Sequence, residues 1–599
     1  MKRTVLKFML AAIVTGMSLP VVSFGADDNL INKIEQLSRE IEQLKNQVKA
    51  NEEKTIKAAE EQKSQARKSE SKEIEELKSQ VKRVEDKSIG KWLTIGGDYR
   101  FRIDSLHGET VSYTNAPAFM GALQKDPVMT GFFSNPQTQA LLSTKSYSGV
   151  AGLTPDVMMG NIMNYLTAPT SAGGAGLTPA AAQAKLQQLG GGAFVQAYKP
   201  KNETLYTNRF GLDLHAKATQ DITVNVKLDM YKSFGSQNDA ATTGNFFADR
   251  VGVFDGTLSH VPSSSLLNVD RAYATWSNIA DQPLWFSVGR RPSTNGAPTN
   301  LKLNNERPGN GGTPALLVDY AFDGMTLGYA PDIDMLPGAY AKVCYGRGFD
   351  SGLKTSSNSI KDTDMLGIAV IPVDTDPLRV WLQWNRGFNI FDFPAMSNTA
   401  AFGTTAPSVN LGDIDWYGAG VMSTFKNVGP GNLNLFTDLG LSITHPNNNV
   451  SANAGFQGLM TGGFLAPEAP KDKTGWAVYA GIRYDLPSKT KIGFEFNHGS
   501  KDWITFAPSA DDMWTSKVGT RGNVFEPYVI QELNLKPISS YLSKAFFKIG
   551  YQYYDFEYSG SNNWVGAPKK ISSIQPSDMM LLTPMKSAHD IYGTFEVHF

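Results

Sequence analysis

Residues 589–599, at the end of the chain, read H-D-I-Y-G-T-F-E-V-H-F. Successive side chains of a strand point to opposite faces. One face of this segment therefore carries Ile, Gly, Phe, Val and Phe, and the other carries Asp, Tyr, Thr, Glu and His. An apolar face toward lipid and a polar face toward a lumen characterise strands of transmembrane β-barrels. The segment predicts the closing strand of such a barrel.

The composition of the 599 residues fits a barrel better than a chain of soluble domains. Only 19% of the residues are charged, glycine is abundant, and aromatic residues make up 11%. No run of about 18 apolar residues follows the N-terminus, so no membrane-spanning helix is predicted. Barrel strands are only half apolar and escape such a search. The formal net charge of −1 argues against nucleic acid as a partner.

Residues 1–25 have the form of a secretory signal peptide. Lys2 and Arg3 precede an apolar core at 8–17, and Gly25 provides a small residue at the expected cleavage point. The apolar core is too short to cross a membrane, which disfavours an uncleaved anchor helix. The sequence therefore predicts export.

Residues 26–88 predict a short α-helical coiled coil in the periplasm. Apolar residues recur there at alternating steps of four and three, which is a heptad seam. The seam weakens over 51–71 and resumes in a shifted phase. A helix of this kind needs partner chains to bury its stripe, so a homo-oligomer is expected; a lone solvated helix is the alternative. The seam residues are Leu30, Ile34, Leu37, Ile41, Leu44, Val48, Ile74, Leu77, Val81 and Val84.

The remainder, 91–599, predicts an all-β fold: a transmembrane antiparallel barrel of sixteen strands. Both barrel ends should lie in the periplasm, so the number is even. Sixteen requires 315–329 to be one strand with a bulge at Asp323; eighteen is the alternative. The predicted strands are 92–104, 206–217, 222–232, 267–278, 284–291, 315–329, 339–349, 363–373, 378–387, 413–425, 433–444, 475–486, 491–499, 524–535, 545–558 and 587–599.

The connections alternate between short turns and long loops, as expected for periplasmic and extracellular ends. The largest loop, 105–203, lacks strand alternation and should be partly helical. In it Asn135, Thr154 and Thr178 are each followed by proline, the signature of a helix start. This loop should cover the barrel mouth or fold into it. A ring of sixteen to eighteen strands should enclose a water-filled lumen.

Tryptophans near predicted strand ends suggest the aromatic girdles that mark membrane interfaces. They are Trp92, Trp276, Trp285, Trp381, Trp384, Trp416 and Trp476.

Charged residues on the polar strand faces are the candidates for lining a pore. Basic rings favour anions and acidic rings favour cations; alternatively, these side chains bond to each other and brace the wall. Adjacent strand residues point to opposite faces, so at most one of Arg290 and Arg291 can point inward. The candidates are Asp98, Arg100, Arg102, Arg209, Asp213, Lys227, Arg290, Arg291, Arg379, Arg483 and Glu495.

No catalytic, metal or cofactor site is predicted. The H-E-x-x-H, P-loop and G-x-S-x-G patterns are absent, and the seven histidines are scattered without metal-ligand spacing. The single cysteine, Cys344, allows no intramolecular disulfide, and no C-x-x-C-H haem attachment sequence is present.

Several stretches resemble bacterial outer-membrane porins, especially porins that carry a periplasmic coiled coil before the barrel. They are W-L-T-I-G-G-D-Y-R-F-R at 92–102, G-R-R-P-S-T-N-G at 289–296, D-Y-A-F-D-G-M-T-L-G-Y-A at 319–330, K-I-G-Y-Q-Y-Y at 548–554 and Y-G-T-F-E-V-H-F at 592–599. The resemblance implies an outer-membrane location, passive diffusion of small hydrophilic solutes or ions, and assembly as trimers.

The terminal strand also resembles the signal that the barrel assembly machinery reads. That resemblance assigns the signal to Tyr592, Gly593, Phe595, Val597 and Phe599.

Two functions remain open from the sequence. One is a channel through the outer membrane. The other is a non-conducting barrel that acts as a sheath or scaffold for another protein, such as an outer-membrane cytochrome, with a possible periplasmic partner bound through the coiled coil.

Overall fold

The structure is a computed structural model in which the chain divides into two units, Met1–Lys91 and Trp92–Phe599. It describes residues 92–599 except 236–261, 263, 293–295, 307–315, 357, 400–402, 508–511 and 535–543, and single positions between 36 and 49. Those single positions are helical. The predicted signal peptide and the seam residues of the predicted coiled coil lie outside the described residues.

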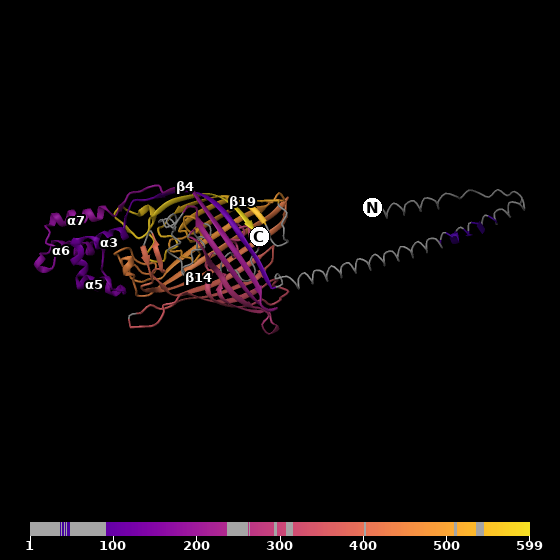
Figure 1. Cartoon of the computed structure of the whole chain (residues 1–599), viewed down its shortest axis with the longest axis horizontal. Coiled ribbons are helices and arrows are strands. Elements are labelled where there is room, and N and C mark those ends of the chain that lie inside the picture. The colour runs from indigo at the N-terminus through magenta and orange to yellow at the C-terminus, as the bar shows by residue number, and fades with distance from the viewer. Residues whose placement is uncertain are drawn as a thin grey trace. The chain divides into compact units, whose positions relative to one another are not determined.

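Within the described residues of the second unit, sixteen antiparallel strands close into one barrel, which confirms the predicted fold and favours sixteen strands over eighteen (Figure 1). Each strand pairs with its neighbours in the chain, and β1 pairs with β21 to close the ring. The strands are β1 (Leu93–Thr110), β4 (Lys201–Lys217), β5 (Ile222–Ser233), β6 (Ser264–Trp276), β7 (Leu284–Arg291), β8 (Phe322–Tyr329), β9 (Tyr340–Phe349), β10 (Thr363–Asp374), β11 (Arg379–Phe391), β14 (Asn410–Val428), β15 (Gly431–Pro446), β16 (Lys473–Asp485), β17 (Thr490–Gly499), β18 (Gly522–Glu532), β19 (Lys544–Phe556) and β21 (Met585–His598).

The closing seam joins the two ends of the second unit. Phe101 of β1 lies opposite Phe595 of β21, and the register runs on to the pair of Asp98 and His598. The Gly97 N–H donates to the Phe599 carbonyl at 2.9 Å, and the Phe599 N–H donates to the Gly97 carbonyl at 3.0 Å. We call the end of the barrel that holds this seam terminus the turn end, and the opposite end, where the long loops lie, the loop end.

The prediction of one strand over residues 315–329 is wrong in part. β8 begins only at Phe322, and Asp323 and Gly324 pair regularly with both neighbouring strands, so no bulge is present there. The preceding residues leave the wall: Val318 forms a bridge with Phe506 of another loop. The strand count is unaffected because the strand is shortened rather than split.

Large apolar side chains point outward on every side of the ring. Period-two alternation places them on the face opposite the buried charges. Among the described residues, no helix is long and apolar enough to cross a membrane. Exposed outward-facing side chains include Ile95, Ile103, Val224, Val288, Leu327, Val343, Ile368, Leu382, Leu439, Trp476, Ile492, Phe494, Phe547 and Ile591.

The loop between β1 and β4 carries helices at the loop end (Figure 1). Side chains of Asn135, Thr154 and Thr178 accept hydrogen bonds from backbone N–H groups in the first turns of α5, α6 and α7, which confirms the three predicted helix starts. Ser146 bridges to Asn449, which ties this loop to the one after β15. The helices are α3 (Ala116–Lys125), α4 (Thr130–Ser134), α5 (Pro136–Leu142), α6 (Pro155–Thr167) and α7 (Pro179–Gly191).

Shorter elements complete the loops. Two small sheets order as β12–β13 and β20–β2–β3. Their strands are β2 (Tyr113–Asn115), β3 (Phe194–Val195), β12 (Met396–Thr399), β13 (Gly403–Thr405) and β20 (Met579–Met580). The 3₁₀ helices are η2 (Pro127–Met129), η3 (Tyr147–Gly149), η4 (Thr170–Ala172), η7 (Ile279–Asp281), η8 (Ala452–Ala454), η9 (Lys517–Gly519) and η10 (Ile571–Ser573).

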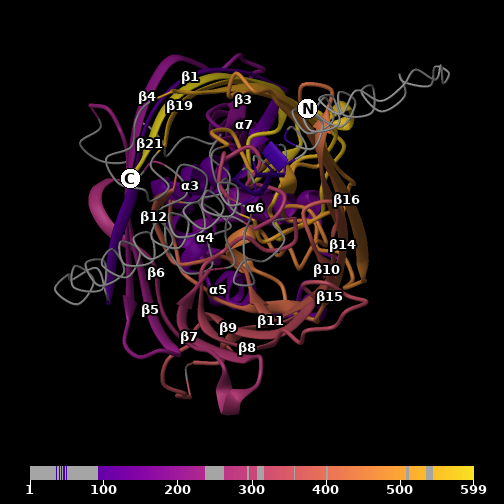
Figure 2. The same ribbon diagram turned by 90° about the vertical axis from the view of Figure 1, so that its right-hand side faces the viewer.

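Part of the barrel interior is packed, which corrects the expectation of a simple water-filled lumen. Loop segments lie within the ring of strands in Figure 2. The facing glycines Gly418 and Gly440 of β14 and β15 leave a hollow in the inner wall. A Cβ at Gly418 would lie 2.7 Å from the Leu317 side chain, and one at Gly440 would lie 2.6 Å from Trp503. Leu317 and Trp503 therefore fill this hollow from two different loops.

The tryptophan girdle is also only partly as predicted. Trp92, Trp276 and Trp476 are exposed, whereas Trp381 and Trp416 are fully buried inside the barrel. The Trp381 indole donates to Asp438 at 3.1 Å, and the Trp416 indole donates to the carbonyl of an inner-loop residue, Ile504, at 2.8 Å. Buried indoles need such acceptors, so these two rings hold the interior together rather than marking the membrane surface.

Candidate functional site on the inner wall

Two loops that enter the barrel are bonded to each other. We call the described residues of 296–321 the first inner loop and those of 500–521 the second inner loop. The Asp319 N–H donates to the Phe506 carbonyl at 2.8 Å, and the Phe506 N–H donates to the Leu317 carbonyl at 3.0 Å. Phe506 is buried and its ring lies 4.6 Å from Trp416. The loops thus form one body against the wall of β14 and β15.

A buried charge network holds both inner loops to the wall strands β17 and β18. Lys302 of the first loop and Lys517 of the second bind the same carboxylate, Glu526 of β18, at 2.7 and 2.6 Å. Lys517 also binds Glu495 of β17, and Lys302 lies 3.3 Å from Asp512. The Lys302, Lys517, Glu495, Glu526 and Asp512 side chains are at most 7% exposed.

Tyrosines complete the partners of these carboxylates. The Tyr479 hydroxyl donates to Glu495 at 2.6 Å, and the Tyr592 hydroxyl donates to Glu526 at 2.8 Å. Buried charges are tolerated when they are paired and hydrogen-bonded, and removing one partner is strongly destabilising. Glu526 is therefore the wall residue on which both inner loops depend.

Near the turn end, predicted pore residues form a second cluster. Lys227 of β5 lies 2.9 Å from Asp98 and 3.1 Å from Asp213. Arg209 of β4 binds Asp229 of β5 at 2.9 Å. The Asp213 side chain is 53% exposed, more than any other side chain of this cluster.

Arg102 and Arg100 follow on the inner face of β1. Arg102 is fully buried, binds Asp104 at 2.6 Å and Asp590 at 3.0 Å, and stacks 4.3 Å from the centre of the Tyr592 ring. Arg100 lies 5.2 Å from the Tyr231 ring centre. Both arginines connect the wall strands next to the seam and brace them.

Arg379 and Arg483 lie on the inner face near a polar cavity of about 200 Å³ at the turn end. Arg379 donates to the Tyr340 hydroxyl at 3.0 Å. Arg483 forms a two-point ion pair with Asp485 at 2.7 and 2.8 Å and donates to the carbonyl of Leu301 at 2.6 Å. Arg483 therefore supports the first inner loop as well as the wall.

Arg290 and Arg291 of β7 point to opposite faces of the wall, because successive side chains of a strand alternate. Arg291 shares the buried face with Ser287, to whose hydroxyl it donates at 2.6 Å. Arg290 shares the outer face with the exposed Val288 and lies 4.0 Å from Asp323. Arg290 does not belong to the inner wall, because the strand register turns it outward.

The inner-wall candidates thus occur as bonded groups rather than as one open ring of a single sign. Wall bracing explains most of their contacts, and Asp213 is the candidate with a largely exposed side chain. Among the described residues, no group of three or more His, Cys, Asp or Glu side chains could hold a metal ion.

Comparison with family models gives one match. Residues 199–599, which include every barrel strand except β1, match the family described as Protein of unknown function (DUF3373). The chain belongs to this family. A comparison with curated protein sequences gives no match.

This chain is similar, at low identity, to several solved structures. OprB of Pseudomonas putida is 10% identical with a TM-score of 0.37, covering 85% of this chain and 95% of that one. An anion-selective porin from Comamonas acidovorans is 10% identical with a TM-score of 0.36, covering 85% and 99%. The outer membrane channel DcaP of Acinetobacter baumannii is 10% identical with a TM-score of 0.34, covering 86% and 99%.

The sequence alone missed the residues that hold the inner loops. Lys302 and Lys517 lie in segments without periodicity, so nothing in the sequence placed them inside the barrel. Glu526 lies in a predicted strand, but both faces of that strand carry apolar residues in the sequence, so alternation alone did not assign Glu526 to the inner face.

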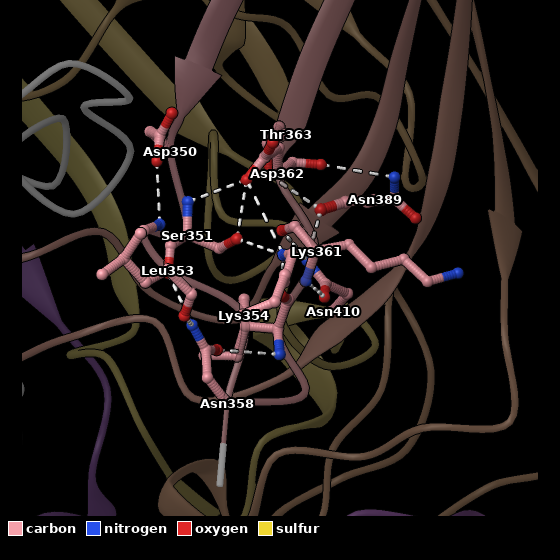
Figure 3. A network of polar contacts seen from close by, with 12 residues as sticks. Asp350, Ser351, Leu353, Lys354, Asn358, Lys361, Asp362, Thr363, Asn389 and Asn410 are labelled. Atoms are coloured by element: carbon pink, nitrogen blue, oxygen red, sulfur yellow. Dashed lines mark hydrogen bonds and ion pairs between the residues drawn. The ribbon is translucent and has the colours of Figure 1, made fainter. Parts of the chain in front are cut away.

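At the loop end, a polar network fixes the loop between β9 and β10 (Figure 3). Asp362 accepts hydrogen bonds from the Ser351 hydroxyl at 2.6 Å and the Ser351 N–H at 2.9 Å. These bonds, with a further contribution from Arg347 at 2.8 Å, lower the pKa of the Asp362 carboxyl below its ordinary value. Asn410 of β14 donates to the carbonyls of Lys361 and Asn389, which joins the loop to the neighbouring strands.

The lowered pKa predicts that this loop opens in acid. A carboxyl with a depressed pKa in the folded state stabilises that state fully above its ordinary pKa and loses the effect as pH falls through the folded value. The Ser351 amide should therefore be protected from hydrogen exchange at neutral pH and lose protection in acid, after correction for the intrinsic exchange rate. Asp362→Asn should expose it already at neutral pH.

Glu109→Gln is the matched control for that measurement, because Glu109 is also a rim carboxylate, paired with Lys586 at 2.9 Å. It should leave the Ser351 amide protected. Equal protection of Ser351 in Asp362→Asn and the unmodified chain would contradict the assigned role of Asp362.

Proposed function

We propose that this chain is an outer-membrane channel for passive diffusion of small hydrophilic solutes or ions, with a lumen narrowed by its two inner loops. The observation that carries the proposal is the closed ring itself, apolar on its outer face and charged on its inner face. The apolar outer face would contact the lipid of a bilayer, and the charged inner face would contact water.

The inner loops make the proposed channel selective rather than wide. The two loops pack against the wall formed by β14 and β15, and Lys302 and Lys517 bind them to Glu526 of β18. Solutes would pass between these loops and the acidic and basic clusters of the remaining wall. A sheath around a second protein is less well supported, because the chain's own loops occupy part of the interior such a guest would need.

The remaining parts of the proposal concern the N-terminal unit and assembly. Residues 1–25 would direct export, and residues 26–88 would form a periplasmic coiled coil that joins barrels into a homo-oligomer, with a trimer favoured, or that binds a periplasmic partner. The segment from Tyr592 to Phe599 would be read by the barrel assembly machinery. We propose no reaction and no cofactor for this chain.

Planar-bilayer recordings of the purified full chain test the channel function. A variant at Asp213 tests whether this inner-wall residue affects ion selectivity. The protein should give stepwise ion currents, in groups of three if it is a trimer. Asp213→Asn should move the reversal potential toward anion preference at about 0.1 M salt, where the screening length is about 10 Å. The shift should largely vanish near 1 M salt, where that length is about 3 Å.

Asp323→Asn is the matched control. Asp323 is 68% exposed, comparable with Asp213, but it lies on the outer face of β8 with Met325 and Leu327. It should not alter the reversal potential. The absence of currents from the folded protein would reject the channel in favour of the sheath or scaffold, and equal effects of the two variants would reject Asp213 as a wall residue.

A further inference from the structure

At the loop end, a histidine of β15 lies between two carboxylates. The His445 Nε2 lies 3.1 Å from Asp415 of β14, and the His445 Nδ1 lies 2.9 Å from Asp472, the residue directly before β16. His445 has the same strand parity as the exposed Leu439, which places it on the outer face. The two ring nitrogens therefore face acceptors from two different parts of the chain.

These two contacts require both ring nitrogens to carry a proton. An ionised carboxylate only accepts hydrogen bonds, and a neutral imidazole has one N–H donor and one acceptor nitrogen. A neutral His445 ring can thus donate to Asp415 or to Asp472, but not to both. The geometry corresponds to the imidazolium form of the ring.

The other charged groups near the ring are themselves paired. Arg386 of β11 binds Asp415 at 2.8 Å and Asp413 at 2.9 Å, and Lys473 lies 3.5 Å from Glu468. A positively charged ring is compatible with these surroundings, because carboxylates lie next to it on both sides. The charged and titratable groups around the ring come from β11, β14 and the segment that enters β16: Arg386, Asp413, Asp415, Tyr417, Glu468, Asp472 and Lys473.

Two other histidines of the wall have neutral partners. His215 lies 2.5 Å from the amide oxygen of Asn225, and His498 lies 2.8 Å from that of Asn523. A side-chain amide accepts from a ring N–H or donates to a ring lone pair, so it suits either charge state of the ring. Of these three histidines, only His445 makes bonds that depend on its charge.

His445 and Asp472 lie at the two ends of the loop that joins β15 to β16. The centre of this loop is packed, and Leu459 and Met460 are fully buried there. Its last part, residues 467–472, contains no helix or strand, and four of its six residues are exposed. We call residues 467–472 the return segment. The bond from His445 to Asp472 therefore fastens an exposed, irregular segment to the wall.

We propose that His445 is a pH-sensitive latch for the return segment. The imidazolium binds Asp415 and Asp472 at once, and the neutral ring keeps only one of them. Asp415 is 8% exposed, whereas Asp472 is 62% exposed and can turn to water without losing hydrogen bonds. On deprotonation the Nδ1 proton therefore goes to water, the Nε2–H stays on Asp415, and Asp472 is released.

The latch closes in acid and opens as the pH rises. Histidine is the side chain whose charge ordinarily changes between about pH 5 and 8. Because the bond to Asp472 needs the second ring proton, the return segment should be held at the acidic end of this range and released at the alkaline end. The sign is opposite to that of the loop held by Asp362, where a carboxylate loses its bonds on protonation. The packed centre of the loop should not respond, and the latch does not depend on conduction by the barrel.

Spin-label spectra of the folded full chain test the latch. A nitroxide on Lys471→Cys reports on the return segment, in a Cys344→Ser background because Cys344 is the only cysteine of the chain. The ratio of the mobile to the immobile spectral component should rise about two- to fivefold from about pH 5 to about pH 8, as expected for loss of an exposed ion pair. Equal spectra at both pH values would overturn the proposal.

Two variants assign the response to the pair of His445 and Asp472. His445→Gln cannot carry a charge, so at both pH values it should show the mobile spectrum that the unmodified pair gives at high pH. Asp472→Asn should also lose the response, because an amide suits either charge state of the ring. A full pH response in His445→Gln would overturn the proposal.

His498→Gln is the matched control, since His498 is also a histidine at the loop end of a wall strand but bonds to the amide of Asn523. It should leave the response of the label unchanged. Heat-modifiable gel mobility checks the folding of each variant, so that release of the return segment is not confused with loss of the fold. Loss of the response in His498→Gln as complete as that in His445→Gln would contradict a local latch.

Discussion

Lys517→Met should raise the single-channel conductance of the barrel at least about twofold, because it releases the second inner loop from the wall. Lys517 is bound to Glu495 and, at 2.6 Å, to Glu526. Breaking a buried ion pair by removing one partner costs about 3–5 kcal/mol. A cost of that size favours the displaced loop by a factor of roughly 100 or more, since each 1.4 kcal/mol is tenfold.

The effect should extend to the first inner loop, because the two loops are bonded through Phe506 and share Glu526. Planar-bilayer recordings of the folded variant give the conductance. Cysteine-reactive probes at an inner position such as Thr505→Cys, buried in the closed state, should react faster in the Lys517→Met background.

Lys548→Met is the matched control for Lys517→Met. Lys548 is also a buried inner-wall lysine and lies 3.2 Å from Glu596, but both residues belong to wall strands, β19 and β21. Its loss removes a buried charge without releasing a loop, and conductance should stay close to that of the unmodified chain. If Lys517→Met folds and conducts like the unmodified chain, the second inner loop does not narrow the lumen.

The alternation of apolar and polar residues was enough to predict most of the strands, and so the fold, from the sequence. The predicted strand 284–291 coincides with β7, and the outward and inward faces of β21 are as the pattern requires. The reason is physical: a slip of one residue would turn a whole apolar face into the lumen, so the register of a two-faced strand is strongly fixed. Alternation also separated Arg291 from Arg290.

The inner loops could not be predicted in this way, because their contacts depend on tertiary structure. Leu317 and Trp503 fit a hollow between glycines of two strands, and no local period records such a fit. The error for the buried tryptophans, which were predicted to lie at the membrane interface, could have been avoided from the sequence. Trp381 has the same strand parity as Arg379, a predicted inner residue, so alternation already placed it inside; its position near a strand end was the weaker guide.

Deletion of Phe599 should reduce the amount of folded barrel in the outer membrane about tenfold or more. The deletion removes the two backbone hydrogen bonds with Gly97, at 2.9 and 3.0 Å, that end the seam between β1 and β21. Each bond contributes about 1 kcal/mol, and an aromatic side chain lost from an apolar surrounding costs about 1.5–3 kcal/mol more. It also removes the last residue of the proposed assembly signal. Heat-modifiable gel mobility of membrane fractions measures the folded barrel.

Phe599→Ala and Phe494→Ala separate the causes of that loss. Phe599→Ala keeps the backbone bonds and removes only the ring, whereas Phe494→Ala removes an outward-facing ring from β17, away from the seam and the terminus. If the ring is part of the signal, Phe599→Ala should resemble the deletion and Phe494→Ala should not. Folded barrels recovered from any of these variants should keep the unmodified conductance, because both rings face away from the lumen. Normal folding of the Phe599 deletion would show that the seam closes without its terminal bonds and that the chain end is not read during assembly.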